Sequence, residues 1–372
     1  MPVKDLHAHP FDEGTITKLE IFENYAKEWL PTFIMSYPNK DLWMFDFFAG
    51  TGKDQNGVAG TPIRLLQQVK SQAGNIFNQK CKINICLNEL DENKFNSMQI
   101  CCDEFVHSNN ELLRLYDKYL FLHYRNGDFA ELFPKTLDTI KENPSLLFLD
   151  QNGMKFLADK YIMNLESLPH TDFLYFLSSS YVLRFGNTPE FQTNLRLDME
   201  KIKENPYKYV HKNILEQLKN KLPNDSDLKL YPFTIKKGAN IYGIIFGAKH
   251  PLAVDKFLKT AWNKNNINGE ANFDIDEDNK KCQLTIFGEK PLTKIEGFQQ
   301  RLRELILNGD IKTNREAYDY TISQGHIDKH AAEEISKMKK EGLIDFEGRT
   351  PLVNYEQTYK NKRIITFQVI KK

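Results

Sequence analysis

The stretch Leu42–Gly60 of this 372-residue chain, LWMFDFFAGTGKDQNGVAG, decides the fold class. Its apolar start predicts a buried strand that ends at Asp46 and leads directly into a glycine-rich turn at Gly50 and Gly52. A helix is expected from about Thr61. Glycines let a backbone approach a ligand closely, and the helix that follows presents the positive end of its dipole. This order of elements is typical of the start of a nucleotide-binding α/β domain.

Two common nucleotide-binding motifs do not fit the glycine turn. A dinucleotide fingerprint, G-x-G-x-x-G, lacks its third glycine, because Lys, Asp and Gln follow Gly52. A phosphate-binding P-loop would need a glycine where the chain has Phe47, and a Ser or Thr where it has Asp54. A tight strand-to-helix turn in some other α/β protein remains an alternative.

The same stretch resembles a third motif. Residues 46–52, DFFAGTG, are similar to the first motif of class I S-adenosylmethionine (SAM)-dependent methyltransferases, D-x-F-A-G-x-G. On this resemblance, the residues expected to bind SAM are Asp46, Ala49, Gly50 and Gly52.

Composition limits the possible classes of protein. The length is sufficient for one large and one small domain, and 26 Phe and 16 Tyr can fill their cores. Fifty Lys plus Arg balance fifty Asp plus Glu, so any basic surface has to be local. The five cysteines form no CxxC pair, no signal peptide is recognisable, and no apolar run is long enough for a membrane helix. We therefore expect a cytoplasmic protein with reduced thiols and no membrane partner.

An acidic residue follows the second predicted strand, residues 82–88. In nucleotide-binding α/β folds, a carboxylate at this place accepts hydrogen bonds from the two ribose hydroxyls. Glu89 is the candidate for this role. Asp91 is the alternate, although capping of the next helix explains it more naturally.

The third predicted strand, residues 119–124, is followed by Arg-Asn-Gly and then Asp128-Phe129. An acid next to an apolar ring suits the exocyclic amine and the face of an adenine. Asp128 and Phe129 are therefore candidates for adenine binding, while an N-cap of the next helix explains Asp128 equally well.

The fourth predicted strand, residues 145–149, ends on Asp150-Gln-Asn-Gly. Groups that meet the substrate lie at the carboxyl ends of parallel strands. Amino-methylating enzymes use D/N-P-P-aromatic here, and this chain keeps the acid but has neither the prolines nor the aromatic residue. Asp150 and Asn152 are the candidate catalytic residues, which would orient a nucleophilic amine or oxygen.

The rest of the first domain completes a methyltransferase-like pattern. A fifth strand over 172–177 is followed by a charged helical insertion over about 188–222. Two apolar strands, 228–236 and 241–249, then form a hairpin signal. Five parallel strands and a terminal hairpin predict an α/β fold with a class I methyltransferase-like, Rossmann-type sheet.

The last part of the chain predicts a winged helix. Helices are expected at 298–307, 313–323 and 327–341, with a closing strand over 363–370, so the predicted domains are 1–290 and 291–372. Cations concentrate on its third helix and ribbon, and those predicted to contact nucleic acid are Lys337, Lys339, Lys340, Lys362 and Arg363. A protein-docking winged helix with solvated lysines is the alternative.

Metal chemistry is not expected from the sequence. His7 and His9 lie near two acids at the start of the chain, but a mobile polar arm explains them equally well. A metal-dependent nuclease that uses Asp150 and Asp172 has no recognisable motif.

Several motifs in order resemble one family. The segments TKLEIFENYAKEWL, DFFAGTGKDQNGVAGTP, CLNELDENKF, GDF, FLDQNG and DFLYFLSSSYVLR together resemble the three-Cys-motif partner proteins. These are bacterial methyltransferase-like proteins, often encoded beside a partner with a CxxxCxxC-type radical cluster motif. The resemblance implies a SAM site and a partner protein in a modification or defence system. The family usually has D-P-x-G after the fourth strand. This chain has Gln151 in place of the proline, and the difference is expected to affect catalysis more than cofactor binding.

Two functions follow from these patterns. The first is a SAM-dependent methyltransferase that acts on nucleic acid together with a partner protein. The second is a catalytically silent, methyltransferase-like adaptor that binds a partner protein or nucleic acid. The altered motif at Asp150, the neutral net charge and the charged insertion favour the adaptor.

Overall fold

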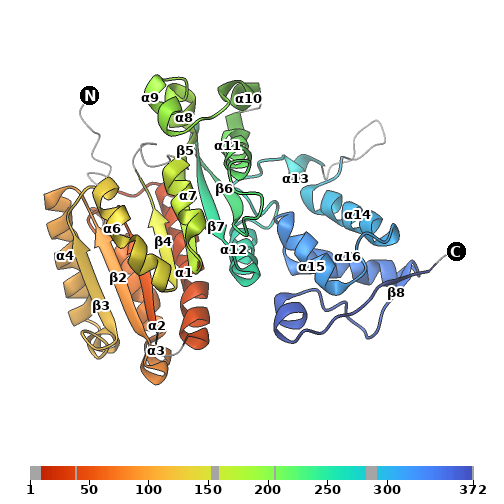
Figure 1. Cartoon of the computed structure of the whole chain (residues 1–372), viewed down its shortest axis with the longest axis horizontal. Helices are drawn as coiled ribbons and strands as arrows, with labels where there is room; N and C mark the ends of the chain where they lie inside the picture. The colour runs from red at the N-terminus through yellow and green to blue at the C-terminus, as the bar shows by residue number, and fades with distance from the viewer. Residues whose placement is uncertain (1–9, 38–39, 152–158, 205–206, 282–290, 371–372) are drawn as a thin grey trace. The chain divides into compact units, whose positions relative to one another are not determined.

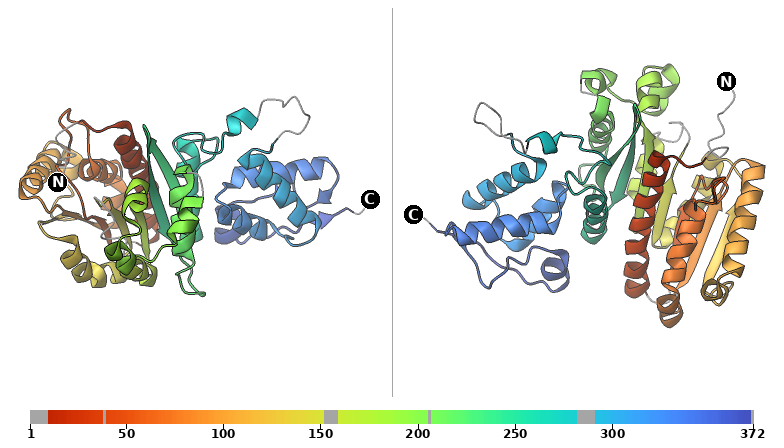
Figure 2. Two further views of the ribbon diagram at one scale, coloured as in Figure 1. Left: turned by 90° about the horizontal axis from the view of Figure 1, so that it is seen from above. Right: turned by 180° about the vertical axis from the view of Figure 1, so that it is seen from behind.

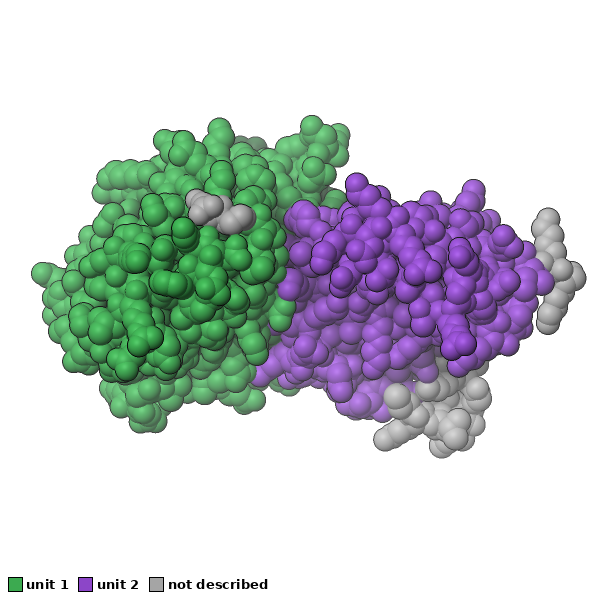
Figure 3. Space-filling view, turned by 90° about the horizontal axis from the view of Figure 1, so that it is seen from below, with its two compact units in different colours: residues 1–249 green, residues 250–372 purple. Residues whose placement is uncertain are grey.

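The computed structural model describes residues 10–37, 40–151, 159–204, 207–281 and 291–370. The chain divides into two compact units, residues 1–249 and residues 250–372, which are coloured separately in Figure 3. No helix of the described residues is long and apolar enough to cross a bilayer.

The first unit is built on a seven-stranded sheet with the order β3-β2-β1-β4-β5-β7-β6 (Figure 1). The strands are β1 (Asp41–Asp46), β2 (Lys82–Asn88), β3 (Leu120–Arg125), β4 (Ser145–Leu149), β5 (Thr171–Ser178), β6 (Lys229–Lys237) and β7 (Asn240–Ala248). The first five are parallel, whereas β7 is antiparallel to both β5 and β6. This order with a reversed β7 is the class I methyltransferase-like sheet, which confirms the predicted fold class.

The pairing register aligns the carboxyl ends of the central strands. Asp46, the last residue of β1, lies opposite Leu87 on one side and Phe148 on the other. Each partner is followed within two residues by the end of its own strand, β2 or β4. The loops that leave these strands are therefore brought together at one edge of the sheet, as expected for open α/β folds.

Helices cover both faces of this sheet, as Figures 1 and 2 show. One face carries α1 (Glu13–Ser36), α2 (Thr61–Ser71), α3 (Ala73–Gln79) and α4 (Glu92–His107). The other carries α6 (Phe129–Glu142), α7 (Asp159–Ser167) and α11 (Val210–Lys219). A short helix, α5 (Asn110–Leu113), follows α4, because Asn109 is extended and its amide donates to the carbonyl of Phe105. The single helix predicted over 93–118 is therefore broken there.

The predicted helical insertion is a series of short helices. They are α8 (Ser179–Phe185), α9 (Pro189–Asn194), α10 (Met199–Glu204), a 3₁₀ turn at Tyr207–Tyr209, and α11. Apolar side chains of this segment, including Leu195, Leu197 and Ile202, are buried in the core of the first unit. The segment is thus part of the main core, although its charged composition predicts a solvated position outside the sheet.

The second unit contains a winged helix. Its elements are α12 (Pro251–Lys264), α13 (Asp278–Lys281), α14 (Lys294–Leu307), α15 (Asn314–Ser323), α16 (Asp328–Lys340), β8 (Ile344–Asp345), a π-helical turn (Glu356–Lys360) and β9 (Gln368–Val369). Strands β8 and β9 pair antiparallel and form the ribbon. Capping boxes at Thr293 and Thr313 begin α14 and α15. The three predicted helices and the ribbon are confirmed, although β9 is shorter than the predicted closing strand.

The division between the units falls earlier than the boundary near residue 290 that the sequence suggests. Helix α12 belongs to the second unit, because the Trp262 ring lies 4.4 Å from the His330 ring and its Nε1 donates to the carbonyl of Gly325. Lys259 of the same helix forms an ion pair with Asp328 at 3.0 Å. The strand predicted over 283–287 lies outside the described residues.

Candidate cofactor and acceptor site

Most of the predicted site residues of the first unit meet at the carboxyl edge of the sheet. Asn88, at the end of β2, holds this edge together: its amide donates to the carbonyls of Phe47 and Gly127, both at 3.0 Å. Its Oδ1 accepts from the Gly127 amide at 3.2 Å. Sequence reasoning missed Asn88, and the available signal was a polar residue within an otherwise apolar strand end.

The glycine turn has the backbone conformation that its sequence predicts. Gly50 and Gly52 have φ of 66° and 84°, in the left-handed region that favours glycine. A Cβ on Gly52 would lie 3.2 Å from the sulfur of Cys101 on α4. The Ala49 amide donates to the carbonyl of Asn88 at 2.9 Å. The turn is therefore seated closely on the end of β2.

Asp54 organises the loop that follows the turn. Its Oδ1 accepts from the amides of Asn56 and Val58, and its Oδ2 accepts from the amide of Phe11 at 2.8 Å. Burial raises the pKa of Asp54, but these backbone hydrogen bonds outweigh it and lower the pKa overall. The segment that leads into α1 is thus attached to the glycine loop, which sequence reasoning did not find.

Glu89 lies directly against the glycine turn. Its Oε2 accepts from the Gly50 amide at 3.0 Å, and its Oε1 accepts from the Asp91 amide at 3.0 Å. The Asp91 side chain instead caps α4 by accepting from the amide of Lys94. Of the two candidate acids, Glu89 is the one that the fold brings to the turn.

Asp128 and Phe129 have local roles in the structure. Asp128 is the N-cap of α6 and accepts from the Ala130 amide at 2.7 Å. Phe129 is only 3% exposed, and its ring lies 5.2 Å from that of Phe47 and 5.1 Å from that of Phe133. Asp128 is thus the N-cap in this structure, as the alternative interpretation predicts. The adenine contacts of Asp128 and Phe129 stay a prediction.

Asp46 is a buried carboxyl group with an unused acceptor. It is 1% exposed; its Oδ1 accepts from the Phe48 amide, whereas its Oδ2 has no hydrogen-bond partner among the described residues. Burial raises the pKa of Asp46 to about 8, opposed by the Phe48 hydrogen bond. The charges of Asp150 and Glu89 contribute to this rise in the pKa, and the charge of Lys18 opposes it.

Asp150, at the end of β4, is held by a cation that the sequence did not predict there. The ammonium of Lys18 on α1 forms a hydrogen-bonded ion pair with Asp150 Oδ2 and lies 4.5 Å from the centre of the Phe176 ring. The two charged side chains are 11% and 20% exposed. Asp150 and Lys18 thus form an ion pair whose two charges both act on the buried carboxyl group of Asp46.

The rest of the acceptor motif is only partly described. Gln151 is 2% exposed, and its Nε2 donates to the hydroxyl of Tyr175 at 2.7 Å, so it anchors the strand end in the core. Asn152 lies outside the described residues.

These groups fit the chemical parts of SAM. SAM presents an ammonium and a carboxylate, a sulfonium, a ribose diol and an adenine. Glycines at positive φ allow close backbone approach, and the Glu89 carboxylate suits a diol. The unpartnered Oδ2 of Asp46 suits a positively charged N–H donor, which would favour the ionised form of this carboxyl group.

The cations of the winged helix differ in their surroundings. Lys337, Lys340, Lys362 and Arg363 are exposed. The ammonium of Lys339 instead donates to the carbonyls of Phe346 and Gly348, at 2.6 and 3.0 Å, and pairs with Asp345 at 2.9 Å. Lys339 therefore attaches α16 to the ribbon in this structure, and its contact with nucleic acid stays a prediction.

Neither metal binding nor disulfide formation is seen in the described part of the chain. No group of three or more His, Cys, Asp or Glu side chains there is arranged to hold a metal ion, and His7 and His9 lie outside it. The described cysteines are free thiols, and burial raises the pKa of Cys86 to about 11.

A comparison with known protein families agrees with the winged helix of the second unit. A family model described as the GMT-like wHTH domain matches residues 274–351. The chain is similar to a Legionella pneumophila str. Philadelphia 1 protein of family DUF519 (12% identity, TM-score 0.37, covering 68% of this chain and 92% of that one).

Two further solved structures are similar to the chain. One is Trm1 from Pyrococcus horikoshii in complex with S-adenosyl-L-methionine (10% identity, TM-score 0.38, covering 79% and 87%). The other is the METTL16 MTase domain (13% identity, TM-score 0.29, covering 60% and 66%). No curated protein sequence matches the chain.

Proposed function

We propose that this chain is a SAM-dependent methyltransferase that acts on nucleic acid. The observation that carries the proposal is the contact between the Gly50 amide and the Glu89 carboxylate at the carboxyl edge of a sheet with a reversed β7. A glycine turn and an adjacent acid at the ends of the first two strands are the two elements that a nucleoside cofactor needs. The winged helix and its exposed cations support nucleic acid as the substrate.

Each candidate residue then has a role toward the cofactor. SAM, when bound, supplies a methyl group activated by the sulfonium. Gly50 and Gly52 would allow the backbone to approach it, Glu89 would accept the ribose hydroxyls, and Asp46 Oδ2 would accept an N–H donor. Asp128 and Phe129 are proposed to meet the adenine.

Asp150 is proposed to orient the acceptor. Its carboxylate would accept an N–H or O–H of the acceptor group, with Asn152 assisting, and this positioning lowers the entropic part of the barrier. The ammonium of Lys18 is bound to Oδ2, so the acceptor group would meet the Oδ1 atom of Asp150. A base in a duplex would also have to be flipped out of the stack. The family resemblance supports a partner of the three-Cys-motif type in a modification or defence system.

A specific observation favours the second candidate, a catalytically silent adaptor. The acid that would orient the acceptor is already neutralised by Lys18, and the residue after it is a core anchor rather than a proline. An adaptor would keep the fold and bind a partner protein or nucleic acid without transferring a methyl group.

Calorimetric titration of the full chain with SAM tests the cofactor proposal. We expect micromolar binding, and we expect Glu89→Gln to weaken it about tenfold, because a hydrogen bond to a charged group contributes about 1.5–3 kcal/mol. Asp91→Asn is the matched control and should leave the affinity unchanged, since Asp91 caps α4. Absence of SAM binding, or equal losses in both variants, would contradict the proposal.

Transfer of a labelled methyl group from SAM to nucleic acid separates the two candidate functions. For an enzyme, Asp150→Ala should reduce the transfer rate about 100-fold at unchanged SAM affinity. For an adaptor, no transfer is expected, and the biological activity of the chain should survive the substitution.

A further inference from the structure

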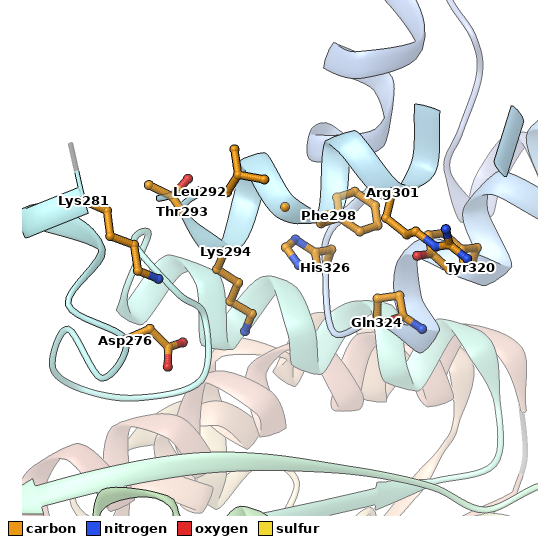
Figure 4. Close-up of a pocket in the computed structure, with 11 residues that line it drawn as sticks. Asp276, Lys281, Leu292, Thr293, Lys294, Phe298, Arg301, Tyr320, Gln324 and His326 are labelled. Atoms are coloured by element: carbon orange, nitrogen blue, oxygen red, sulfur yellow. The ribbon is translucent and has the colours of Figure 1, made fainter. Parts of the chain in front are cut away.

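A pocket of about 380 Å³ lies within the winged-helix unit (Figure 4). It is bounded by the first turns of α14, the end of α15 and the turn before α16. Its size is within the range of small-molecule sites. None of its lining residues belongs to the proposed cofactor site.

Three nearly parallel aromatic rings form one side of the pocket. The ring centre of Phe298 lies 4.1 Å from that of His326, with an angle of 13° between the planes. It lies 5.9 Å from that of Tyr320, with an angle of 14°. Phe298 and His326 are buried, whereas Tyr320 is half-buried. Tyr320 therefore forms the accessible end of the stack.

The stack is uncharged at neutral pH. Burial lowers the pKa of His326 to about 2, and the charges of Lys294 and His330 lower it further. His326 Nδ1 lies 3.1 Å from Nδ1 of His330, so the two imidazoles share a hydrogen bond. A neutral aromatic surface of this kind favours stacking of another planar ring.

The basic side chains of the lining do not favour a free anion. Each of them forms an ion pair: Lys281 with Asp278 at 2.7 Å, Lys294 with Glu270 at 2.9 Å, and Arg301 with Glu304 at 2.9 Å. A phosphate would compete with these carboxylates, whereas a neutral ring with hydrogen-bonding edges would not. Figure 4 shows Arg301 beside Tyr320, with Gln324 close by, so polar groups are available at the open end of the stack.

We propose that this pocket binds a nucleobase, which continues the aromatic stack at Tyr320 and presents its polar edge to Gln324 and Arg301. Stacking on aromatic side chains is how proteins hold unpaired bases, since every base has a π-face. The source is an unpaired base of a single strand or a free nucleotide, and the experiment distinguishes them. The inference goes beyond methyl transfer and does not depend on the SAM site.

The position of the pocket relative to the exposed cations fits a strand. His326 comes directly before α16, whereas Lys337 and Lys340 lie in its last turn. A helix of this length, 13 residues, spans roughly 20 Å. A short single strand can therefore place a base in the pocket and its phosphates near these lysines.

The test uses the full chain and a single-stranded oligonucleotide that contains the fluorescent base 2-aminopurine. Wild-type protein should quench the fluorescence on binding, and Tyr320→Leu should bind about tenfold more weakly, because stacking of one base contributes about 1–3 kcal/mol. Tyr355→Leu is the matched control: Tyr355 is also half-buried and stacked on a tyrosine, but does not line the pocket. Equal losses in the two variants, or no quenching, overturn the inference.

Gln324→Ala provides a second variant whose side chain is exposed, so its fold should be unaffected. The Gln324→Ala variant should bind the oligonucleotide several-fold more weakly. Gln300 is an exposed glutamine outside the pocket, so Gln300→Ala is the control and should bind like wild type. Equal affinities of these two variants would contradict the contact between Gln324 and the edge of the base. A duplex that binds as tightly as the single strand also overturns the inference. If a nucleoside monophosphate displaces the oligonucleotide, the pocket is assigned to a free nucleotide. If it does not, the pocket is assigned to an unpaired base of a single strand. SAM titration of the same samples reports separately on the cofactor proposal.

Discussion

The carboxyl edge of the sheet and the winged helix differ in how their charged side chains are paired. At the sheet edge, the buried carboxyl group of Asp46 feels the charges of Asp150, Glu89 and Lys18, and one of its oxygens has no partner among the described residues. In the winged helix, Arg303 is shared between Glu334 at 2.5 Å and Glu341 at 2.7 Å, so its charge is matched by nearby acids.

The difference indicates in which region the charged side chains mainly stabilise the fold and in which they are arranged for a ligand. Local rules of capping and charge pairing are followed where structure is the main requirement. A buried, unpartnered carboxyl oxygen next to like charges costs stability and is retained where a ligand supplies what is missing. Asp255 of the second unit also has an unpartnered Oδ1, but its carboxylate pairs with Lys259. The sheet edge is therefore the better candidate for a ligand-dependent site, and three predictions test this comparison.

The largest effect is expected from Asp46→Asn. The pKa of Asp46 is raised from about 3.8 in the unfolded chain to about 8 in the folded protein, so the folded state holds the proton more tightly. The stability from protonated Asp46 is fully present below about pH 4 and is lost as the pH rises toward 8. A neutral Asn avoids this loss. In chemical denaturation, the free energy of unfolding of the variant should therefore rise relative to that of wild type as the pH rises, by up to about 5 kcal/mol.

Asp172→Asn is the control for this prediction. Burial raises the pKa of Asp172 to about 7, but this residue lies near the start of β5 and accepts a hydrogen bond from Tyr25 at 2.6 Å. Both variants should flatten the dependence of stability on pH, whereas only Asp46→Asn should weaken SAM binding. A stability difference for Asp46→Asn that does not change with pH would show that the buried carboxyl is ionised throughout.

An intermediate effect is expected from Lys18→Met. Removing the cation leaves Asp150 partly buried without its partner, which should lower the free energy of unfolding by about 2 kcal/mol. The loss should be larger at pH 9 than at pH 6, because Lys18 also lowers the pKa of Asp46. The measurement is urea denaturation at both values of pH.

Lys237→Met is the matched control for Lys18→Met. Lys237 pairs with Asp12, but its side chain is 39% exposed and that of Asp12 is 40% exposed. Its loss should cost less than about 1 kcal/mol, as for other surface pairs. Similar costs for the two lysines would remove the distinction between the sheet edge and an ordinary surface.

The sequence predicts the fold better than the site. The bounds of β2 and β4 agree with the sequence-based prediction, because buried parallel strands are continuous apolar runs that end sharply. The positions of the glycine turn and of Glu89 also follow from the sequence, since both come directly after a strand end, and their binding of SAM stays a prediction. The contact of Lys18 with Asp150 was not found, because 132 residues separate them and only the tertiary fold brings them together.

The same limit applies elsewhere in the chain. Helix α12 has an amphipathic pattern, but that pattern does not say which core it joins, and only the packing of Trp262 on His330 assigns it to the second unit. The apolar periodicity likewise predicts α16 but not the hydrogen-bond partners of its lysines. The partner of Lys339 is a ribbon carbonyl, and only the tertiary fold brings the ribbon next to α16.

The smallest effect concerns those lysines. Lys339→Ala should lower the free energy of unfolding by about 1 kcal/mol, because it removes hydrogen bonds to two ribbon carbonyls. Lys340→Ala should leave stability unchanged and weaken nucleic-acid binding, reducing the slope of log affinity against log salt concentration by about 1. Denaturation and salt-dependent binding of both variants separate these roles. A reduced slope for Lys339→Ala would mean that its ammonium leaves the ribbon for a phosphate, and the winged helix would then share the ligand-dependent character of the sheet edge.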